Sequence, residues 1–259
     1  MNKKKVAIIG CGNLGTSIAN GLLVNKDEYD LIVTRRNTNG LEPLKKKGAT
    51  VTSDNIEACM ESDIILLSLK PYNIQSVLSQ LKGELKDKIV VSLATGVSTV
   101  DLKSYSRLDH VFRAMPNTAT DVKESITCLC SSKQTAMNED VITLFNKIGA
   151  TIEIDEDLMD SATILGACGI AYAMRFIRAM IQGGIEIGFD ASTAGAIVNQ
   201  TVKGAAQLLL ERKHHPEFEI DKVTTPKGCT IVGLNEMEHN GFSSSLIKGI
   251  VSSYDKINS

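Results

Sequence analysis

The sequence KVAIIGCGNLG, from Lys5 to Gly15, decides the fold of the first half of the chain. Its first five residues, Lys5 to Ile9, are mostly apolar and branched, which predicts a short buried strand. A glycine-rich turn follows at once and leads into a helical pattern that continues to Leu23. Strand, glycine turn and helix in this order are typical of the phosphate-binding corner of an α/β domain.

Each glycine of the turn has its own task in a dinucleotide site. Gly10 permits the tight turn, Gly12 lets a pyrophosphate approach the backbone, and Gly15 lets the helix pack closely on the strand. The amino end of the helix attracts phosphate because its first amides have no partner within the helix. We therefore predict cofactor contacts at Gly10, Gly12, Asn13, Leu14 and Gly15; the alternative is a glycine-rich turn without a ligand.

The second predicted strand, Leu31 to Thr34, ends in two basic residues. Arg35 and Arg36 stand where an NAD-binding domain usually carries an acidic residue for the ribose hydroxyls. Positive charge suits the 2′-phosphate of NADPH, so Thr34, Arg35 and Arg36 are predicted to contact the adenosine end of that cofactor. Charged residues at strand ends are often only solvated, and the sequence leaves NADH open as an alternative.

Strand and helix patterns alternate up to a strand at Thr151 to Ile154 and then give way to helices alone. Long helical patterns run from Leu158 to about Gly184 and from Ala191 to Lys213. We predict an α/β Rossmann-type dinucleotide-binding domain over residues 1–155, followed by an all-α domain over residues 156–259. The first long helix is apolar on several faces and rich in small residues, which predicts a homodimer; a tight monomer core is the alternative.

Composition narrows the class of ligand and the compartment. A net charge of -2 and 4% aromatic residues argue against a nucleic-acid surface. The six cysteines lack the paired spacing of a metal or redox site, so we expect no metal and free thiols in a reducing cytosol. We find no signal-peptide core and no uninterrupted apolar run as long as a membrane helix. A cytoplasmic protein with a small-molecule substrate is expected.

The stretch DKVTTPKGCTIVGLNEME, from Asp221 to Glu238, predicts a turn that runs directly into a helix. Gly228 and the hydroxyls of Thr225 and Thr230 lie at this helix start, which suits a carboxylate or a phosphate; an ordinary capped helix is the alternative. No GxSxG, HExxH, Walker or kinase motif is present. The chemistry therefore needs mainly orientation, which fits hydride transfer from a nicotinamide.

Five motifs in order along nearly the whole chain resemble those of pyrroline-5-carboxylate reductase, the last enzyme of proline synthesis. They are IGCGNLG at Ile9 to Gly15, SLKP at Ser68 to Pro71, ATGV at Ala94 to Val97, RAMPNT at Arg113 to Thr118, and VTTPKGCTIVGLNEME at Val223 to Glu238. The resemblance implies hydride transfer from NADPH or NADH to the C=N bond of 1-pyrroline-5-carboxylate, giving L-proline. It also implies a homodimer of interlocked helical domains with each site built across the dimer, and assembly of dimers into a larger ring.

The resemblance further implies which residues bind substrate and cofactor. The amides of Gly228, Cys229 and Thr230, with the Thr225 hydroxyl, would hold the substrate carboxylate, and Thr230 would hydrogen-bond the ring nitrogen. A protonated imine is already electrophilic, so placing the nicotinamide against it supplies most of the catalysis. The other implied cofactor contacts are Asn55 near the adenosine end, and Ser68, Lys70, Pro71, Ala94, Thr95 and Asn117.

The chain departs from the family pattern at three single positions. Ile170 stands where a proline is common, Lys227 where a glycine is common, and Cys229 where threonine, alanine or glycine is usual. The loop that begins at Asn117 also lacks the usual proline and glycines. None of these changes removes a residue that the mechanism requires.

Two other functions stay open at this point. A β-hydroxyacid dehydrogenase would place a lysine on its central helix, where this chain carries Arg175 and Arg178. A protein that senses NADPH without turnover would need the same nucleotide site, and only turnover excludes it.

Overall fold

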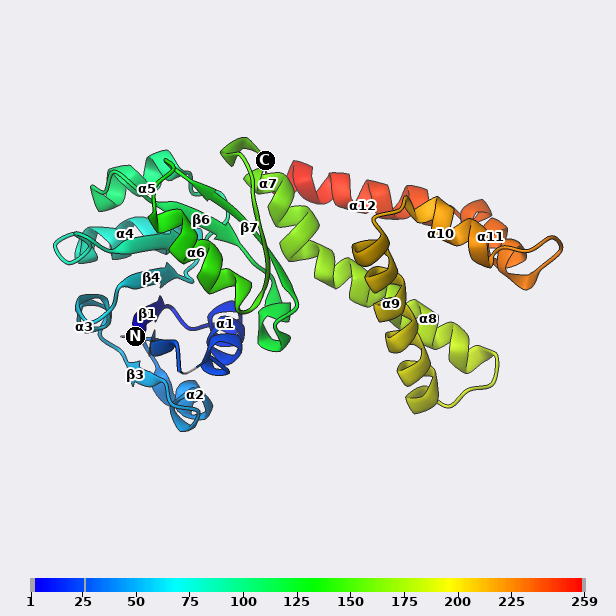
Figure 1. Ribbon diagram of the computed structural model, residues 1–259, viewed down its shortest axis with the longest axis horizontal. Coiled ribbons are helices and arrows are strands. Elements are labelled where there is room, and N and C mark those ends of the chain that lie inside the picture. The colour runs from blue at the N-terminus through cyan, green and yellow to red at the C-terminus, as the bar shows by residue number, and fades with distance from the viewer. Residues whose placement is uncertain (1–2, 26, 258–259) are drawn as a thin grey trace. The chain divides into compact units, whose positions relative to one another are not determined.

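The computed structural model describes residues 3–25 and 27–257. The chain divides into two compact units, one ending at Cys168 and the other beginning at Gly169 (Figure 1). The first unit holds all the strands of the described chain, and the second consists of helices. The predicted order of an α/β domain followed by a helical domain is confirmed.

The first unit is built on an eight-stranded sheet with the order β3-β2-β1-β4-β5-β6-β7-β8. Neighbouring strands run parallel except β7, which is antiparallel to β6. The chain moves outward from β1 in one direction to β2 and β3 and then in the other to β4, which is the switch point of a doubly wound sheet. The strands are β1 (Lys4–Ile9), β2 (Tyr29–Thr34), β3 (Thr50–Thr52), β4 (Ile64–Leu67), β5 (Ile89–Ser92), β6 (Phe112–Met115), β7 (Ser125–Ser131) and β8 (Gly149–Glu153).

Helices cover both faces of this sheet and make two separate cores. One core joins the sheet to side chains such as Ile18, Leu44 and Phe145, and the other joins it to side chains such as Ile74 and Leu102. Central strands are buried on both faces, which explains why their sequences are continuous apolar runs. The helices are α1 (Asn13–Leu23), α2 (Glu42–Lys46), α3 (Asn55–Met60), α4 (Pro71–Leu81), α5 (Thr99–Ser106), α6 (Met137–Asn146) and α7 (Met159–Ala162).

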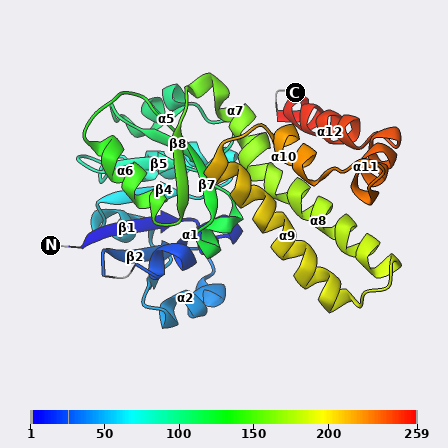
Figure 2. The same ribbon diagram turned by 45° about the vertical axis from the view of Figure 1, so that its right-hand side comes forward.

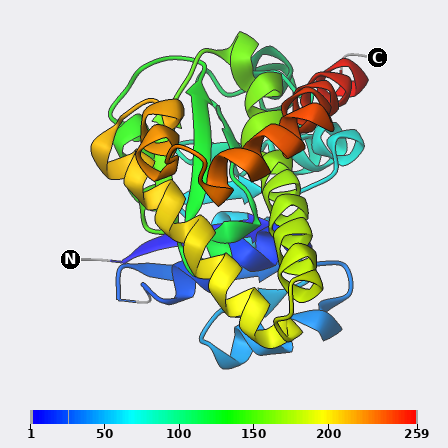
Figure 3. The ribbon, with the colours of Figure 1, turned by 90° about the vertical axis from the view of Figure 1, so that its right-hand side faces the viewer.

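The second unit begins with a long antiparallel hairpin of α8 (Gly169–Glu186) and α9 (Ala191–Arg212), seen side by side in Figures 2 and 3. A Cβ atom on Gly184 would lie 3.2 Å from the Cβ of Ala194, so the hairpin closes on two small residues. The Tyr172 hydroxyl donates to Ser253 Oγ at 2.7 Å and joins α8 to the last helix. The remaining helices are α10 (Pro216–Val223), α11 (Cys229–His239) and α12 (Phe242–Ile257).

The second unit buries very little of its apolar surface by itself. Ala194 and Val198 are its only fully buried apolar residues among those described, while side chains on every helix stay exposed, including Met174, Leu210 and Ile247. Contiguous exposed apolar surface marks a contact with another molecule. The exposed apolar surface of this unit therefore indicates a contact with another molecule, which agrees with the dimer predicted from the sequence.

The long helix predicted from Leu158 to about Gly184 is interrupted. Thr163–Cys168 forms a π-helical segment between α7 and α8. The carbonyl of Gly166 is turned to a partner outside the helix and accepts from Asn117 Nδ2 at 3.1 Å.

The sequence predicted no apolar run as long as a membrane helix, but the helical run Glu156–Glu186 reaches that length. By length and composition this run could cross a bilayer, since its most apolar window has a mean hydropathy of 1.5 in spite of two arginines. Only 6% of that window is buried within the chain. One such helix is weak evidence for a membrane, and burial against a second subunit explains the same composition.

Candidate active site

The glycine turn after β1 has the backbone that its sequence predicts. Gly10 has a φ of +88°, and a Cβ atom there would lie 2.7 Å from the Ser68 carbonyl oxygen. A Cβ atom on Gly15 would lie 3.2 Å from the side chain of Ile8. Gly10 excludes a larger residue, because its φ is positive and backbone already fills the space, and Gly15 is in tight contact with the side chain of Ile8.

Gly12 differs from the other two glycines because nothing lies within 4 Å of its Cβ position. It is the N-cap residue of α1, with no side chain capping it and no acidic residue in the first helical turn. Open space beside unpaired helix amides is what a pyrophosphate requires. Burial raises the pKa of the Cys11 thiol, so this side chain stays neutral beside the turn.

Thr34 joins the glycine turn to the start of α3. Its backbone carbonyl accepts from the Cys11 amide at 2.7 Å, and its hydroxyl donates to Asn55 Oδ1 at 2.6 Å. Thr34 is buried, so its hydroxyl positions the turn and Asn55. Arg35 and Arg36 follow directly at the end of β2, and both side chains are exposed.

Two further loops predicted to contact cofactor follow β4, which lies beside β1, and β5, which lies beside β4. Ser68 donates its amide to the Ile9 carbonyl at 2.9 Å, and Lys70 and Pro71 open α4 with the lysine exposed. Ala94 is buried, whereas Thr95 is half-buried. Parallel strands end at one edge of the sheet, so the structure brings these loops and the glycine turn together.

Asn117 is engaged inside the protein. Its Oδ1 accepts from the Ala119 amide at 2.9 Å, which caps a short 3-10 turn, while its Nδ2 donates to the Gly166 carbonyl. The structure thus gives Asn117 a role in holding the chain around Gly166. The sequence suggested only a cofactor contact.

The turn before α11 has an open helix start. The Gly228 amide donates to the Thr225 carbonyl at 2.9 Å, and a Cβ atom on Gly228 would collide with Thr225 Oγ1. No side chain caps α11, and its first turn has no acidic residue. Cys229 is exposed and Thr230 is half-buried. The start of α11 thus has no side-chain cap, which is compatible with the predicted contact of the Cys229 and Thr230 amides with an anion.

Lys227 stands at the tip of this turn with a φ of +58°. This is the left-handed region that favours glycine, which explains why the family pattern has glycine at this position.

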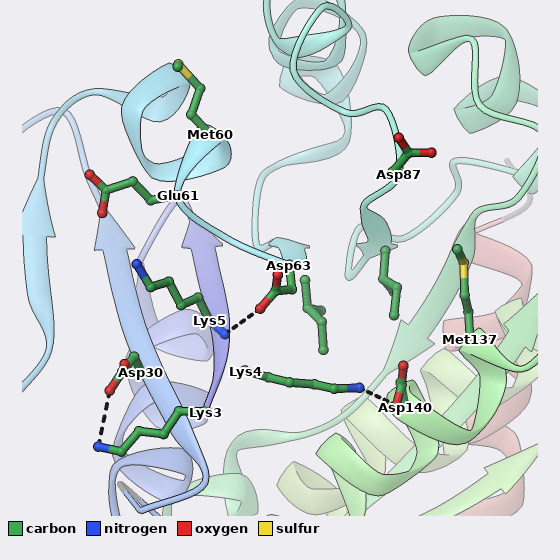
Figure 4. Close-up of a pocket in the computed structure, with 12 residues that line it drawn as sticks. Lys3, Lys4, Lys5, Asp30, Met60, Glu61, Asp63, Asp87, Met137 and Asp140 are labelled. Carbon is green, nitrogen blue, oxygen red and sulfur yellow. Dashed lines mark hydrogen bonds and ion pairs between the residues drawn. The ribbon is translucent and has the colours of Figure 1, made fainter. Parts of the chain in front are cut away.

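A broad hollow at the other edge of the sheet is lined by residues at the amino ends of its strands (Figure 4). Two of its lysines pair with carboxylates, since Lys3 Nζ lies 3.4 Å from Asp30 and Lys4 pairs with Asp140. The backbone amide of Lys5 donates to Asp63 at 2.9 Å. Ligands of such sheets bind at the carboxyl ends of the strands, so this hollow is not the candidate site. Among the described residues, no group of three or more His, Cys, Asp or Glu side chains is placed to hold a metal.

Sequence reasoning missed one polar cluster next to the cofactor edge. Arg113 on β6 is buried and pairs with Glu156 at 2.9 Å. An arginine inside a four-residue strand that is otherwise apolar was the available signal, but the sequence could not name its partner.

Comparison with known proteins agrees with the motifs. A family model for pyrroline-5-carboxylate reductase dimerisation matches residues 156–259, and a model for coenzyme F420-dependent NADP oxidoreductase matches residues 5–96. Pyrroline-5-carboxylate reductase 1 of Dictyostelium discoideum is 46% identical over 97% of this chain, which spans only 49% of that relative's length. Pyrroline-5-carboxylate reductase 2 of the same organism is 40% identical over 98% of this chain and 92% of its own length.

A solved structure extends the likeness to three dimensions. Pyrroline carboxylate reductase of Plasmodium falciparum with NADP bound is 27% identical, with a TM-score of 0.89 over 99% of this chain and 98% of that one. The order of the motifs, the fold and the 40% identity to a relative over nearly its whole length all indicate the same family. The chain belongs to the pyrroline-5-carboxylate reductase family.

Proposed function

We propose that this chain reduces the C=N bond of 1-pyrroline-5-carboxylate to give L-proline, with NADPH as the hydride donor. The observation that carries this proposal is the uncapped start of α11, which offers amides and hydroxyls to a small carboxylate in a chain of this family. Because the cofactor phosphates are assigned to the glycine turn of α1, the uncapped start of α11 is proposed for the substrate carboxylate.

The nucleotide-binding half fits a nicotinamide dinucleotide. Gly12 leaves open space at the start of α1, and the exposed side chains of Arg35 and Arg36 follow β2 with no acidic residue next to them in the sequence. Two guanidinium groups at this strand end favour a 2′-phosphate and therefore NADPH over NADH. Asn55, Ser68, Lys70, Pro71, Ala94 and Thr95 are proposed as further cofactor contacts on the same edge.

The substrate-binding half holds and orients an imine acid. We assign the carboxylate to the amides of Cys229 and Thr230 and to the Thr225 hydroxyl. Gly228 contributes through its missing side chain, since its own amide is bonded within the turn. The Thr230 hydroxyl accepts from the protonated ring nitrogen and keeps the C=N bond polarised. The bound cofactor supplies the hydride, so orientation is the main task of these residues.

The proposed working unit is at least a homodimer. The exposed apolar surface of α8 to α12 and the match to a dimerisation model over residues 156–259 support it. We propose further that dimers assemble into a larger ring, that the functional domains divide between residues 155 and 156, and that the protein works in the cytoplasm. Size-exclusion chromatography with light scattering tests the assembly, and a monomer at working concentration would refute the dimer.

One assay separates this function from its alternatives. Purified protein is mixed with NADPH and 1-pyrroline-5-carboxylate, and both the loss of NADPH absorbance and the formation of proline are followed. Saturable turnover to proline is the expected result. Binding of NADPH without turnover would favour a sensor, and oxidation of a β-hydroxyacid with NADP in its place would favour a dehydrogenase.

A further inference from the structure

A buried arginine of the RAMPNT motif holds two carboxylates at the start of the helical run that begins at Glu156. Arg113 is only 4% exposed. Its Nη1 donates to Glu156 Oε1 at 2.9 Å, and its Nη2 lies 3.8 Å from Asp160 Oδ1. An arginine buried to this extent must keep its carboxylate partners, because leaving either charge alone in the interior is costly.

Glu156 in turn binds the first residue of α5. The Thr99 amide donates to Glu156 Oε1 at 2.7 Å, and the Thr99 hydroxyl donates to the other carboxylate oxygen. A carboxylate at a helix amino terminus is favoured by the helix dipole. Burial alone would raise the pKa of Glu156, but the hydrogen bonds from Thr99 and Arg113 outweigh it and hold the pKa below its ordinary value.

The segment that Glu156 holds in this way directly follows the cofactor loop Ala94 to Gly96. That loop is anchored at one end, where the Ala94 amide donates to Ser92 Oγ at 3.3 Å. At the other end, Ser98 and Asp101 form a capping box on α5, and Thr99 is bound to Glu156. Between the two anchors Gly96 takes a φ of +70°, so the course of the loop depends on where its ends are fixed.

The same motif provides a second anchor for the helical run. Asn117 binds the Gly166 carbonyl in the π-helical segment, while Arg113 binds residues ten and six positions earlier, Glu156 and Asp160. The two ends of RAMPN thus hold residues 156–166 against the sheet unit.

We infer that Glu156, held by Arg113, is a positioning residue for the nicotinamide cofactor, because it fixes the amino end of α5 and with it the loop Ala94 to Gly96. The inference rests on the proposed function to the extent that the loop contacts the cofactor. Glu156 itself touches Thr99 and Arg113 and needs no contact with cofactor or substrate.

The test measures NADPH binding to the purified full-length protein by calorimetry, with no substrate present. Thr99→Val removes one donor to Glu156 and keeps the branched shape and the amide, so we expect a Kd about fivefold higher, as one lost hydrogen bond would give. Glu156→Gln should weaken the binding of NADPH at least as much, because a neutral side-chain amide cannot accept all the hydrogen bonds that the carboxylate accepts from Thr99 and Arg113.

Asp160→Asn is the matched control, since it removes the other carboxylate beside Arg113 without touching α5. It should lower the melting temperature while NADPH affinity stays within about twofold of wild type, as expected for a change outside the site. In turnover, Thr99→Val should raise the KM for NADPH and leave the KM for pyrroline-5-carboxylate unchanged at saturating NADPH.

Either of two results overturns the inference: unchanged NADPH affinity in Thr99→Val, or equal weakening in Asp160→Asn. If the wild type binds NADPH but makes no proline, the proposed function fails and the binding series still decides the role of Glu156. If the wild type binds no nicotinamide cofactor, both fail.

Discussion

The Gly228 amide donates a hydrogen bond to the Thr225 carbonyl at 2.9 Å, which closes the turn before α11 upon itself. The next two amides, of Cys229 and Thr230, are therefore the first that remain for a ligand. The collision that a Cβ atom on Gly228 would make with Thr225 Oγ1 explains why this position needs glycine.

Thr230→Ala should slow the reaction and leave the fold intact. The variant loses the hydroxyl assigned to the ring nitrogen, so the transition state should lose about 1 to 3 kcal/mol of stabilisation. This loss corresponds to a kcat/KM that is roughly fivefold to 150-fold lower. Steady-state kinetics with pyrroline-5-carboxylate measures it. Thr224→Val is the control, because the Thr224 hydroxyl already donates to the Ile220 carbonyl at 2.8 Å. Full activity in Thr230→Ala would refute the assignment.

The Gly12→Ala variant should stay folded but bind the cofactor more weakly. The added methyl group meets no protein atom within 4 Å, so the protein should stay folded, with only the modest loss of stability that alanine causes in place of glycine at a helix N-cap. It would occupy the space assigned to the pyrophosphate, and the Kd for NADPH should rise about tenfold or more, the scale of a lost charge-assisted contact. Gly83→Ala is the control, because Gly83 is equally open but follows α4. Unchanged NADPH affinity in Gly12→Ala would place the pyrophosphate elsewhere.

Replacing Arg35 and Arg36 together with glutamine should change cofactor preference. The KM for NADPH should rise about tenfold or more, through loss of charge-assisted hydrogen bonds, while the KM for NADH stays nearly constant. The effect should shrink at high salt because both side chains are exposed. The double variant Lys82→Gln, Lys86→Gln removes the same charge beyond the end of α4 and should not discriminate. Equal losses for the two cofactors would contradict a 2′-phosphate contact.

Lys227→Gly should stabilise the turn before α11. Lys227 has a φ of +58°, where a side chain costs about 1 to 2 kcal/mol and glycine pays less. The greater freedom of glycine in the unfolded chain offsets part of this, so a net gain of about 0.5 kcal/mol is expected in urea unfolding. Lys227→Ala keeps the strained backbone and should show no gain. If the glycine variant is no more stable than the alanine variant, a side chain at position 227 does not strain the backbone and the prediction is wrong.

The sequence by itself determined the elements whose causes are local. The apolar run to Ile9 and the glycines after it fixed strand, turn and the start of α1, and Pro71 fixed the start of α4, because these patterns depend on neighbours along the chain. The helix predicted near Cys229 begins there for the same reason, since Gly228 can take the backbone of the turn.

The tertiary structure alone decided which distant residues meet. Arg113 and Glu156, or Asn117 and Gly166, are separated by more than forty positions, and only the folded chain brings them together. The π-helical segment arises at that contact, so no local period could predict it. The exposure of the apolar side chains of α8 likewise follows from how little the rest of the second unit covers them. The local sequence pattern determined the helices and strands, whereas the burial of charge and apolar surface determined which of them are in contact.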